Sequence, residues 1–154
     1  MKGYLIILLP LIIGSLSGVL FGNGIAKNQM WFARLEKPAI NPPGYLFGIV
    51  WPILYLMIGI SYFIIYNSPD PRADYALLVG AIQLILNFIW TPIFFNYHRI
   101  DIALINIIAL WVLIIYTSVL FSRINMTASQ LLIPYLLWVS FATILNYKFY
   151  KLNK

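Results

Sequence analysis

A chain of 154 residues that is 62% hydrophobic, 17% aromatic and 9% charged has too few charges to keep its surface in water, because soluble domains carry about 25% charged residues. The composition therefore excludes a soluble globular domain and predicts a protein surrounded by lipid. The net charge of +6 reflects four acidic residues against ten basic ones rather than a dense basic patch, which excludes disorder and nucleic-acid binding. Cysteine is absent, so disulfides and thiolate chemistry are excluded as well.

Five stretches of the chain contain no charged residue, and they lie at 3–26, 38–69, 75–97, 102–122 and 124–147. A helix crosses a membrane with about 20 apolar residues, and each stretch is long enough. Membrane β-strands are about 10 residues of alternating polarity, a pattern that these runs do not show. We therefore predict an all-α membrane protein, a single domain over 1–154 that forms a bundle of five transmembrane helices near 4–26, 44–66, 75–96, 102–121 and 129–148.

The first predicted helix carries Gly14, Gly18 and Gly22 at intervals of four residues. Two overlapping G-x-x-x-G steps form a ridge against which another helix can pack closely. This ridge is either the face of a homodimer or an internal contact, and we slightly favour the internal contact. The apolar run exceeds the roughly 7–15 residues of a signal-peptide core, so we expect this helix to stay attached.

A long connection over 27–43 separates the first two helices and is predicted to be an interfacial loop. Trp31 and Phe32 are aromatic anchors, and the charged residues Arg34 and Lys37 follow them, as in segments that lie at a membrane surface. Prolines stiffen the return into the second helix, and they include Pro42 and Pro43. We expect this loop to cover one end of the bundle as a lid.

Aromatic and polar residues recur at helical spacing on the second and third helices. Trp51 and Tyr55 begin an aromatic face on the second helix, a pattern that more often means packing or an interfacial belt than a ligand site. On the third helix Gln83, Asn87 and Trp90 share one face. Lipid offers an amide no partner, so both amides are expected to point into the bundle. Whether they join helices or hold a ligand is left open.

The last predicted helix brings Trp138, Phe141 and Ala142 together. The small Ala142 leaves space beside the large indole ring, which is expected of a pocket wall rather than of a filled core. Four prolines fall within or at the ends of predicted helices, and they are Pro10, Pro52, Pro92 and Pro134. We expect these prolines to kink the helices and so make room for a cavity.

Metal and proton-relay chemistry is disfavoured by the types of residue that the chain contains. His98 is its one histidine, which rules out a haem held by two histidines and a zinc site with three histidine ligands, so no metal is expected. Asp70, Asp74 and Asp101 flank helix ends rather than lie at their centres. An ion-coupled transporter is therefore disfavoured.

Basic residues set the predicted orientation of the bundle. With five crossings, one side receives Lys2, Arg72 and Arg123. The other side receives Lys27, Arg34, Lys37, Arg99, Lys148, Lys151 and Lys154. This excess predicts that the C-terminus lies inside the cell.

The sequence resembles the TspO or translocator protein family, also called tryptophan-rich sensory proteins and peripheral benzodiazepine receptors. The resemblance rests on blocks in a fixed order, which are Trp31-Phe32, Leu35, Lys37-Pro38, Pro42-Pro43, Phe47, Val50-Trp51, Leu54-Tyr55, Gly59, Gln83-Leu84, Leu86-Asn87, Trp90, Pro92, Phe94-Phe95, Pro134-Tyr135-Leu136, Trp138, Phe141-Ala142-Thr143 and Leu145-Asn146-Tyr147. It implies a five-helix bundle, often dimeric, in a bacterial cell membrane.

The resemblance also implies a pocket for tetrapyrroles such as protoporphyrin IX and haem, and for synthetic benzodiazepine-site ligands. The implied pocket residues are Trp51, Tyr55, Asn87, Trp90, Trp138, Phe141 and Ala142. A flat macrocycle gains from stacking on indole faces, and Arg34 and Lys37 of the lid are expected to meet its propionates. A sterol-recognition pattern of Leu145, Tyr147 and Lys151 is a weaker implication.

Three functions follow from this resemblance. A porphyrin-binding sensor or regulator needs affinity and a responsive loop, and we place it first. An enzyme that degrades porphyrin under light and oxygen comes second, and the resemblance points to Trp51 and Trp138 as its electron donors. A transporter comes third. The expected partners are a tetrapyrrole, which is a ligand or a substrate, and membrane lipid, and no obligatory cofactor is expected.

Overall fold

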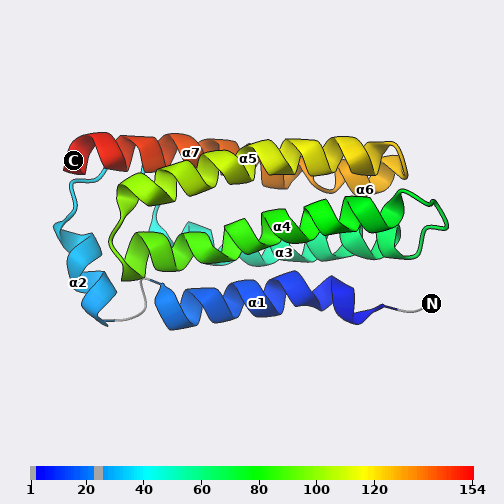
Figure 1. Cartoon of the computed structure of the whole chain (residues 1–154). Coiled ribbons are helices and arrows are strands. Elements are labelled where there is room, and N and C mark those ends of the chain that lie inside the picture. The colour runs from blue at the N-terminus through cyan, green and yellow to red at the C-terminus, as the bar shows by residue number, and fades with distance from the viewer. Residues whose placement is uncertain (1–2, 23–25) are drawn as a thin grey trace.

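The computed structural model describes residues 3–22 and 26–154, and helices make up most of them (Figure 1). The elements in chain order are α1 (Leu5–Phe21), α2 (Ala26–Arg34), α3 (Gly44–Tyr66), α4 (Ala73–Thr91), the π-helical turn η1 (Pro92–Asn96), α5 (Ile100–Ser122), α6 (Met126–Gln130) and α7 (Ile133–Asn153). The all-helical fold class is confirmed. The bounds of α3 match the predicted second helix, 44–66.

The described residues contain more helices than the five predicted, because two short helices accompany the five longer ones, and the number of helices that cross the membrane stays a prediction. Residues 27–43 are not a loop throughout, since α2 occupies their first part. The helix predicted over 129–148 is divided into α6 and α7. Asn125 begins α6, because its side-chain oxygen accepts a hydrogen bond from the Ala128 amide at 3.1 Å. Such an N-cap starts a new helix.

The ends of two other helices also differ from the prediction. The first helix ends at Phe21, and the predicted continuation over 23–25 lies outside the described residues, as does Lys2. The third helix changes to a π turn at Pro92. Proline has no N–H for the regular helical hydrogen bond, and the Tyr97 amide instead donates to the Pro92 carbonyl at 2.9 Å, five residues back.

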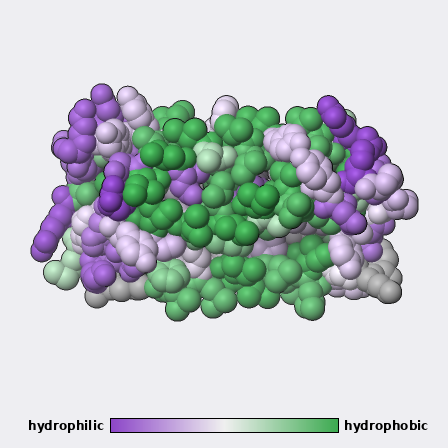
Figure 2. All heavy atoms as spheres, viewed as in Figure 1, coloured by the Kyte–Doolittle hydropathy of each residue, from purple (hydrophilic) through white to green (hydrophobic). Residues whose placement is uncertain are grey.

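Four helical segments are long and apolar enough to cross a membrane. They are Gly44–Tyr66, Ala73–Asn96, Ile100–Ser122 and Met126–Asn153, whereas α1 is apolar but shorter, with 17 residues. Figure 2 shows a hydrophobic band across the middle of the visible face, with hydrophilic residues gathered toward the two ends. These are the features of an integral membrane protein.

The five longer helices form a closed ring. α1 packs against α3 and α4, α4 against α5, α5 against α7, and α7 against α3, with α6 packed on α3 and α5. The approach of α7 to α3 is the loosest of these. α2 lies at the end of the bundle where α7 ends, opposite the N-terminus (Figure 1). The order of the ring brings α3, α4 and α7 to a common centre.

Glycines on α1 and α3 allow these two helices to pack closely against each other. A Cβ at Gly59 would meet the backbone of Ile7, so this glycine permits the close approach of α3 to α1. A Cβ at Gly14 would meet the ring of Tyr55 on α3, whereas Gly18 faces open space. The predicted glycine ridge is therefore an internal contact at Gly14 but not at Gly18, and its role in a dimer stays a prediction.

Candidate functional site

A continuous chain of hydrogen bonds runs through the centre of the bundle and joins α3, α4 and α7. Tyr55 Oη donates to Asn87 Oδ1 at 2.8 Å, and Asn87 Nδ2 donates to Tyr135 Oη at 2.8 Å. Tyr135 Oη donates to Gln83 Oε1 at 2.7 Å, and Gln83 Nε2 donates to Tyr62 Oη at 2.6 Å. We name these five side chains the amide–tyrosine chain.

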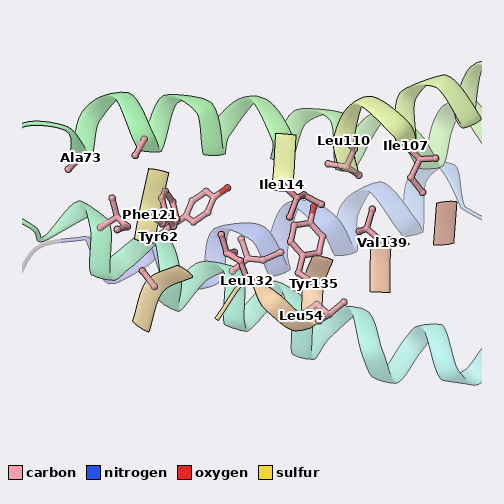
Figure 3. Close-up of a cluster of buried hydrophobic side chains, with 14 residues drawn as sticks. Leu54, Tyr62, Ala73, Ile107, Leu110, Ile114, Phe121, Leu132, Tyr135 and Val139 are labelled. Atoms are coloured by element: carbon pink, nitrogen blue, oxygen red, sulfur yellow. The ribbon is translucent and has the colours of Figure 1, made fainter. Parts of the chain in front are cut away.

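The amide–tyrosine chain ends on the backbone, where Tyr62 Oη donates to the Gly80 carbonyl at 2.7 Å. Figure 3 shows Tyr62 and Tyr135 among the buried side chains of the core. Gln83 and Asn87 are 1% and 6% exposed, so both amides point into the bundle as expected. Each amide uses its oxygen and its nitrogen within the chain. This favours the helix-joining role, and a ligand role for Asn87 stays a prediction.

Aromatic rings fill the place where α3 and α7 approach each other loosely. Trp51 and Trp138 meet edge to face, with ring centroids 6.5 Å apart and planes at 88°. Phe47 packs edge-on against Trp138 at 5.7 Å, and Phe141 lies 5.6 Å from the same ring. All four rings are partly buried. We name them the aromatic seam: Phe47, Trp51, Trp138 and Phe141.

Trp138 brings a free hydrogen-bond donor to the aromatic seam. Its Nε1 is buried, and it finds no acceptor among the residues that the structure describes. Ala142, one turn further along α7, is half-buried and packs against the neighbouring core. Trp51 stacks on Tyr55 at 5.3 Å and 30°, so the seam borders the amide–tyrosine chain. Since buried N–H groups are normally paired, this donor is suited to an acceptor on a ligand.

Trp90 was predicted to line the pocket, but in the structure its ring does not contact the rings of the aromatic seam. Its Nε1 donates to Asn146 Oδ1 at 2.9 Å, and its ring stacks on Phe94 at 4.8 Å and 23°. Asn146 in turn donates to the Ile100 carbonyl at 3.2 Å. Trp90 therefore connects α4 to α7 through a hydrogen bond and packs with the aromatic residues beneath α2.

The first part of the predicted lid is α2, and its aromatic residues pack onto the end of the bundle. Trp31 lies parallel to the ring of His98 with centroids 4.3 Å apart, and edge-on to Phe94 at 5.6 Å. Phe32 lies 5.5 Å from Phe95. We name these rings the lid cluster, which consists of Trp31, Phe32, Phe94, Phe95, His98 and Phe149.

The two lid cations differ in their surroundings. Lys37 Nζ donates to the Phe32 carbonyl at 2.9 Å and lies 4.8 Å above the ring of the same residue. Its ammonium group therefore stabilises the C-terminal end of α2, where a cation is favourable. Arg34 is exposed in the last turn of α2. Both predicted propionate partners are exposed, and Lys37 is the one whose ammonium group is bonded to carbonyls of α2 and the residue after it.

The segment after α2 is tied to the end of α7. The Glu36 amide donates to Asn153 Oδ1 at 2.8 Å, and Asn153 Nδ2 donates back to the Glu36 carbonyl at 2.9 Å. Pro42 and Pro43 then lead into α3, with Pro43 as its N-cap at φ −61° and ψ 144°. Paired hydrogen bonds on one side and prolines on the other hold the lid segment at this end of the bundle.

His98 stands out in the lid cluster for its backbone and its protonation. Its φ of 57° lies in the left-handed region that non-glycine residues rarely adopt. Its Nε2 is buried without a partner in the described chain. Burial and the charge of Lys27 lower the pKa of His98 below its usual 6.5, outweighing a hydrogen bond to the Phe95 carbonyl. The imidazole under Trp31 is therefore neutral at pH 7.

The residues of the sterol-recognition pattern do not share one face of α7. Leu145 is buried, whereas Tyr147 is 49% exposed. Lys151 Nζ lies 6.0 Å above the ring of Tyr147. The pattern therefore combines an inward leucine with an outward pair, and sterol binding stays a prediction.

Sequence reasoning did not name Phe94, Phe95, His98 and Phe149 of the lid cluster as site residues, and it also missed three members of the amide–tyrosine chain and the aromatic seam. Tyr135 precedes Trp138 by three residues and Tyr62 follows Tyr55 by seven, so helical spacing places each pair on one face. Phe47 likewise lies four residues before Trp51. That spacing is the signal that finds all three, although it does not tell which neighbouring helix each residue meets.

Comparison with known proteins agrees with this architecture. The TspO/MBR family matches residues 6–152. The chain is 38% identical to the tryptophan-rich protein TspO of Chlorobaculum tepidum over 130 residues, which are 82% of each chain. It is 32% identical to the tryptophan-rich sensory protein of Cereibacter sphaeroides over 129 residues, 84% of this chain and 80% of the relative.

An animal relative extends the comparison. The chain is 31% identical to the translocator protein of Homo sapiens over 138 residues, which are 88% of this chain and 80% of the relative. The match to the family covers nearly all of the long helices and the whole lid segment. A membrane-embedded helical bundle with a tryptophan-lined seam, matched over residues 6–152, belongs to the TspO/MBR family.

Proposed function

We propose that this chain is a membrane-embedded tetrapyrrole-binding protein that acts as a sensor or regulator. Its ligands are protoporphyrin IX and haem, and synthetic benzodiazepine-site ligands share the site. The observation that carries the proposal is the buried Nε1 of Trp138 within the aromatic seam, which has no hydrogen-bond partner among the residues that the structure describes. A flat apolar macrocycle stacks on the indole faces of Trp51 and Trp138, and a carbonyl or propionate oxygen accepts the Trp138 hydrogen bond.

The lid supports a regulatory rather than a purely storage role. Arg34 lies exposed at the end of α2, in a position to meet a propionate that reaches out of the seam. The lid segment is held by an exposed pair of hydrogen bonds between Glu36 and Asn153. Such an exposed contact is weak enough to break when a ligand binds. The resulting change in the position of the lid is what a partner protein recognises.

The proposed setting is a bacterial cell membrane. All five longer helices cross it, with α1 tilted less than its longer neighbours because it has 17 residues. The C-terminus lies inside, because the end that carries α2 and the end of α7 holds most of the basic residues. A homodimer is part of the proposal, and the outward Gly18 together with exposed α1 residues offers one face for it.

Binding is tested by titrating the purified protein with protoporphyrin IX and following the Soret absorbance. Trp138→Phe keeps a ring and removes the N–H, so we expect affinity about fivefold weaker, from the loss of one hydrogen bond. Trp138→Ala also removes the stacking face, and we expect a loss of about 30-fold or more. Trp111→Phe is the control, because Trp111 Nε1 donates a hydrogen bond to Ser140 Oγ at 2.8 Å on an exposed face of the bundle, away from the seam. Unchanged affinity in both Trp138 variants contradicts the proposed site.

Light-dependent degradation of the porphyrin is the second candidate function. It is favoured by the two indoles of the seam, whose centroids are 6.5 Å apart. An indole in contact with a photoexcited porphyrin can transfer one electron to it, which leaves an indole radical cation and a porphyrin radical anion. Oxygen adds to the porphyrin radical anion, and the oxygenated porphyrin then returns one electron to the indole radical cation. Phenylalanine still offers a ring for stacking but does not donate the electron.

Bleaching of the porphyrin absorbance under light and oxygen tests this activity. We expect Trp51→Phe and Trp138→Phe to lose most of the bleaching while Trp51→Phe keeps its affinity, because the apolar contact area changes little. Trp111→Phe serves again as the control. If wild type bleaches no faster than free porphyrin in detergent, the enzyme function is excluded and the binding function stands alone.

A further inference from the structure

A hollow lies at the opposite end of the bundle from the lid. It has a volume of about 290 Å³ and opens between the start of α4 and the end of α5. Arg72, Tyr75 and Arg123 contribute its polar part, and Ala76, Leu120 and Ile124 its apolar part. None of these residues belongs to the aromatic seam or the lid cluster, so the hollow is independent of the proposed tetrapyrrole site.

Arg72 is fixed in place at the edge of this hollow. Its Nε and Nη2 donate to the Asp70 carboxylate at 3.0 and 2.7 Å, and Nη2 also donates to the Arg123 carbonyl at 2.8 Å. The hydrogen bonds from Arg72 hold the pKa of Asp70 down at about 2, so the pair is charged at neutral pH. A guanidinium has five N–H groups, and Nη1 remains available for a further acceptor.

Arg123 provides the net positive charge. Its side chain is exposed, and within the described residues no carboxylate lies at ion-pair distance from it. Asp70 neutralises Arg72, and Asp74 in the first turn of α4 is exposed but does not line the hollow. Two guanidinium groups therefore face the hollow against one carboxylate that is already bound.

The position of the hollow relates it to the membrane surface. α4 continued by η1, and α5, are each long and apolar enough to span a membrane, and the hollow lies at the start of α4 and the end of α5. Tyr75 and Tyr116 share a hydrogen bond of 2.7 Å between their hydroxyls on the outer face of the same two helices. Tyrosines are typical of the level of lipid headgroups. Ala76 lies one turn further into α4 than Arg72, and Leu120 lies about one turn further into α5 than Arg123, so both apolar residues are on the hydrocarbon side of the two arginines.

We propose that this hollow binds the phosphate group of an anionic phospholipid. Arginine binds phosphate through paired N–H groups, which Arg123 and the Nη1 of Arg72 supply. The first carbons of the lipid lie against Ala76 and Leu120. The apolar part of the hollow favours a lipid headgroup over free phosphate, because a free anion gains nothing from burying apolar surface.

The test uses the full-length protein in a neutral detergent at constant ionic strength. The probes are dihexanoyl phosphatidylglycerol, dihexanoyl phosphatidylcholine and inorganic phosphate, and the rise in the thermal unfolding midpoint gives each affinity. We expect phosphatidylglycerol to bind about tenfold more tightly than either other probe, and Arg123→Gln to remove about that advantage. Lys148→Gln is the control, because it removes one exposed charge at the opposite end.

Three results overturn the proposal. The first is equal affinity of wild type and Arg123→Gln for phosphatidylglycerol. The second is equal affinity of wild type for phosphatidylglycerol and phosphatidylcholine, since the site then does not distinguish an anionic headgroup from a zwitterionic one. The third is inorganic phosphate binding as tightly as phosphatidylglycerol, which means a free-anion site. If Arg123→Gln proves unstable without lipid, Arg123→Lys replaces it. This variant keeps the charge, loses the paired geometry, and is expected to bind phosphatidylglycerol more weakly than wild type.

Discussion

The amide–tyrosine chain and the aromatic seam lie side by side between the same helices, yet they are held together differently. In the chain, the hydroxyls and amides form directed hydrogen bonds of 2.6–2.8 Å from Tyr55 to Tyr62. In the seam, the rings meet at centroid distances of 5.6–6.5 Å, and the indole N–H of Trp138 has no acceptor among described residues. One region specifies the packing, and the other tolerates change.

The difference follows from the physics of the two kinds of contact. A hydrogen bond weakens steeply when its angle or length changes, so the chain fixes the register of α3, α4 and α7 relative to one another. Ring contacts are favourable over a broad range of angles and distances. The seam can therefore rearrange around an inserted ligand while the chain beside it keeps the helices in place. Tyr55 belongs to the chain and stacks on Trp51 of the seam. A ligand that displaces Trp51 would therefore disturb Tyr55 before the other members of the chain.

The largest effect on stability is expected from Tyr135→Phe. The variant keeps the ring but leaves Asn87 Nδ2 and Gln83 Oε1 without their partner, and both side chains are buried. Two hydrogen bonds are lost, and we expect the free energy of unfolding to fall by about 2 kcal/mol. Thermal unfolding in detergent, followed by circular dichroism, measures the change.

A matched control exists for this variant on the outer face of the bundle. Tyr116→Phe removes an exposed hydrogen bond to Tyr75, and we expect a loss below about 0.5 kcal/mol. Equal losses in Tyr135→Phe and Tyr116→Phe would mean that the central chain does not specify the packing, and the contrast with the seam would disappear.

Asn87→Ala decides between the two roles that the sequence left open for this amide. It breaks two bonds, but Tyr135 Oη keeps its bond to Gln83, so we expect a loss of about 1 kcal/mol in the free energy of unfolding. With both amide atoms occupied in the chain, the affinity for protoporphyrin IX should change less than twofold, about 0.4 kcal/mol. A tenfold weaker affinity with an unchanged unfolding midpoint would instead assign Asn87 to the ligand.

The seam should respond in the opposite manner. Trp138→Phe removes an N–H that has no partner in the described chain and keeps a ring against Trp51 and Phe47. We expect the free energy of unfolding to change by less than about 0.5 kcal/mol, since the loss of packed area is offset by removal of an unpaired buried donor. A loss as large as that of Tyr135→Phe would show that the seam is a fixed core and not an adaptable one.

The sequence predicted the helical, membrane-spanning character of this fold because lipid imposes a simple requirement on composition and on the length of apolar runs. It also predicted that Gln83 and Asn87 point inward. It did not predict that Trp90 packs beneath the lid, because helical spacing gives a face but not the neighbour that the face meets. The partner of Trp90 is Asn146, which is 56 residues away.

The lid shows a second limit of sequence reasoning. α2 is a short helix in which polar and charged residues flank the adjacent Trp31 and Phe32, so no long apolar run marks it. The helix is stabilised by the packing of Trp31 and Phe32 on η1 and by Lys37 on its last carbonyls. These are contacts with distant residues or across a turn, and short helices depend on them more than on propensity.

The smallest effect concerns the lid and depends on pH. Because the pKa of His98 is lowered in the folded protein, the undocked or unfolded state binds the proton more readily. The docked lid is therefore fully stabilised above the usual pKa of 6.5 and loses stability as the pH falls below it. The charge of Lys27 acts in the same direction, whereas Asp101, which lines the same hollow as His98, is already bonded to Arg99.

This loss should appear as lower hydrogen-exchange protection of the α2 amides at about pH 5.5 than at about pH 8, after correction for intrinsic exchange. His98→Phe keeps a ring beneath Trp31 and cannot be protonated, so the protection of its lid should no longer depend on pH. Since the seam contains no group that titrates in this range, its protection serves as the internal reference. A pH dependence that persists in His98→Phe, or that appears equally in the seam helices, would mean that His98 does not control the docking of α2, and that the lid and the seam open as one unit.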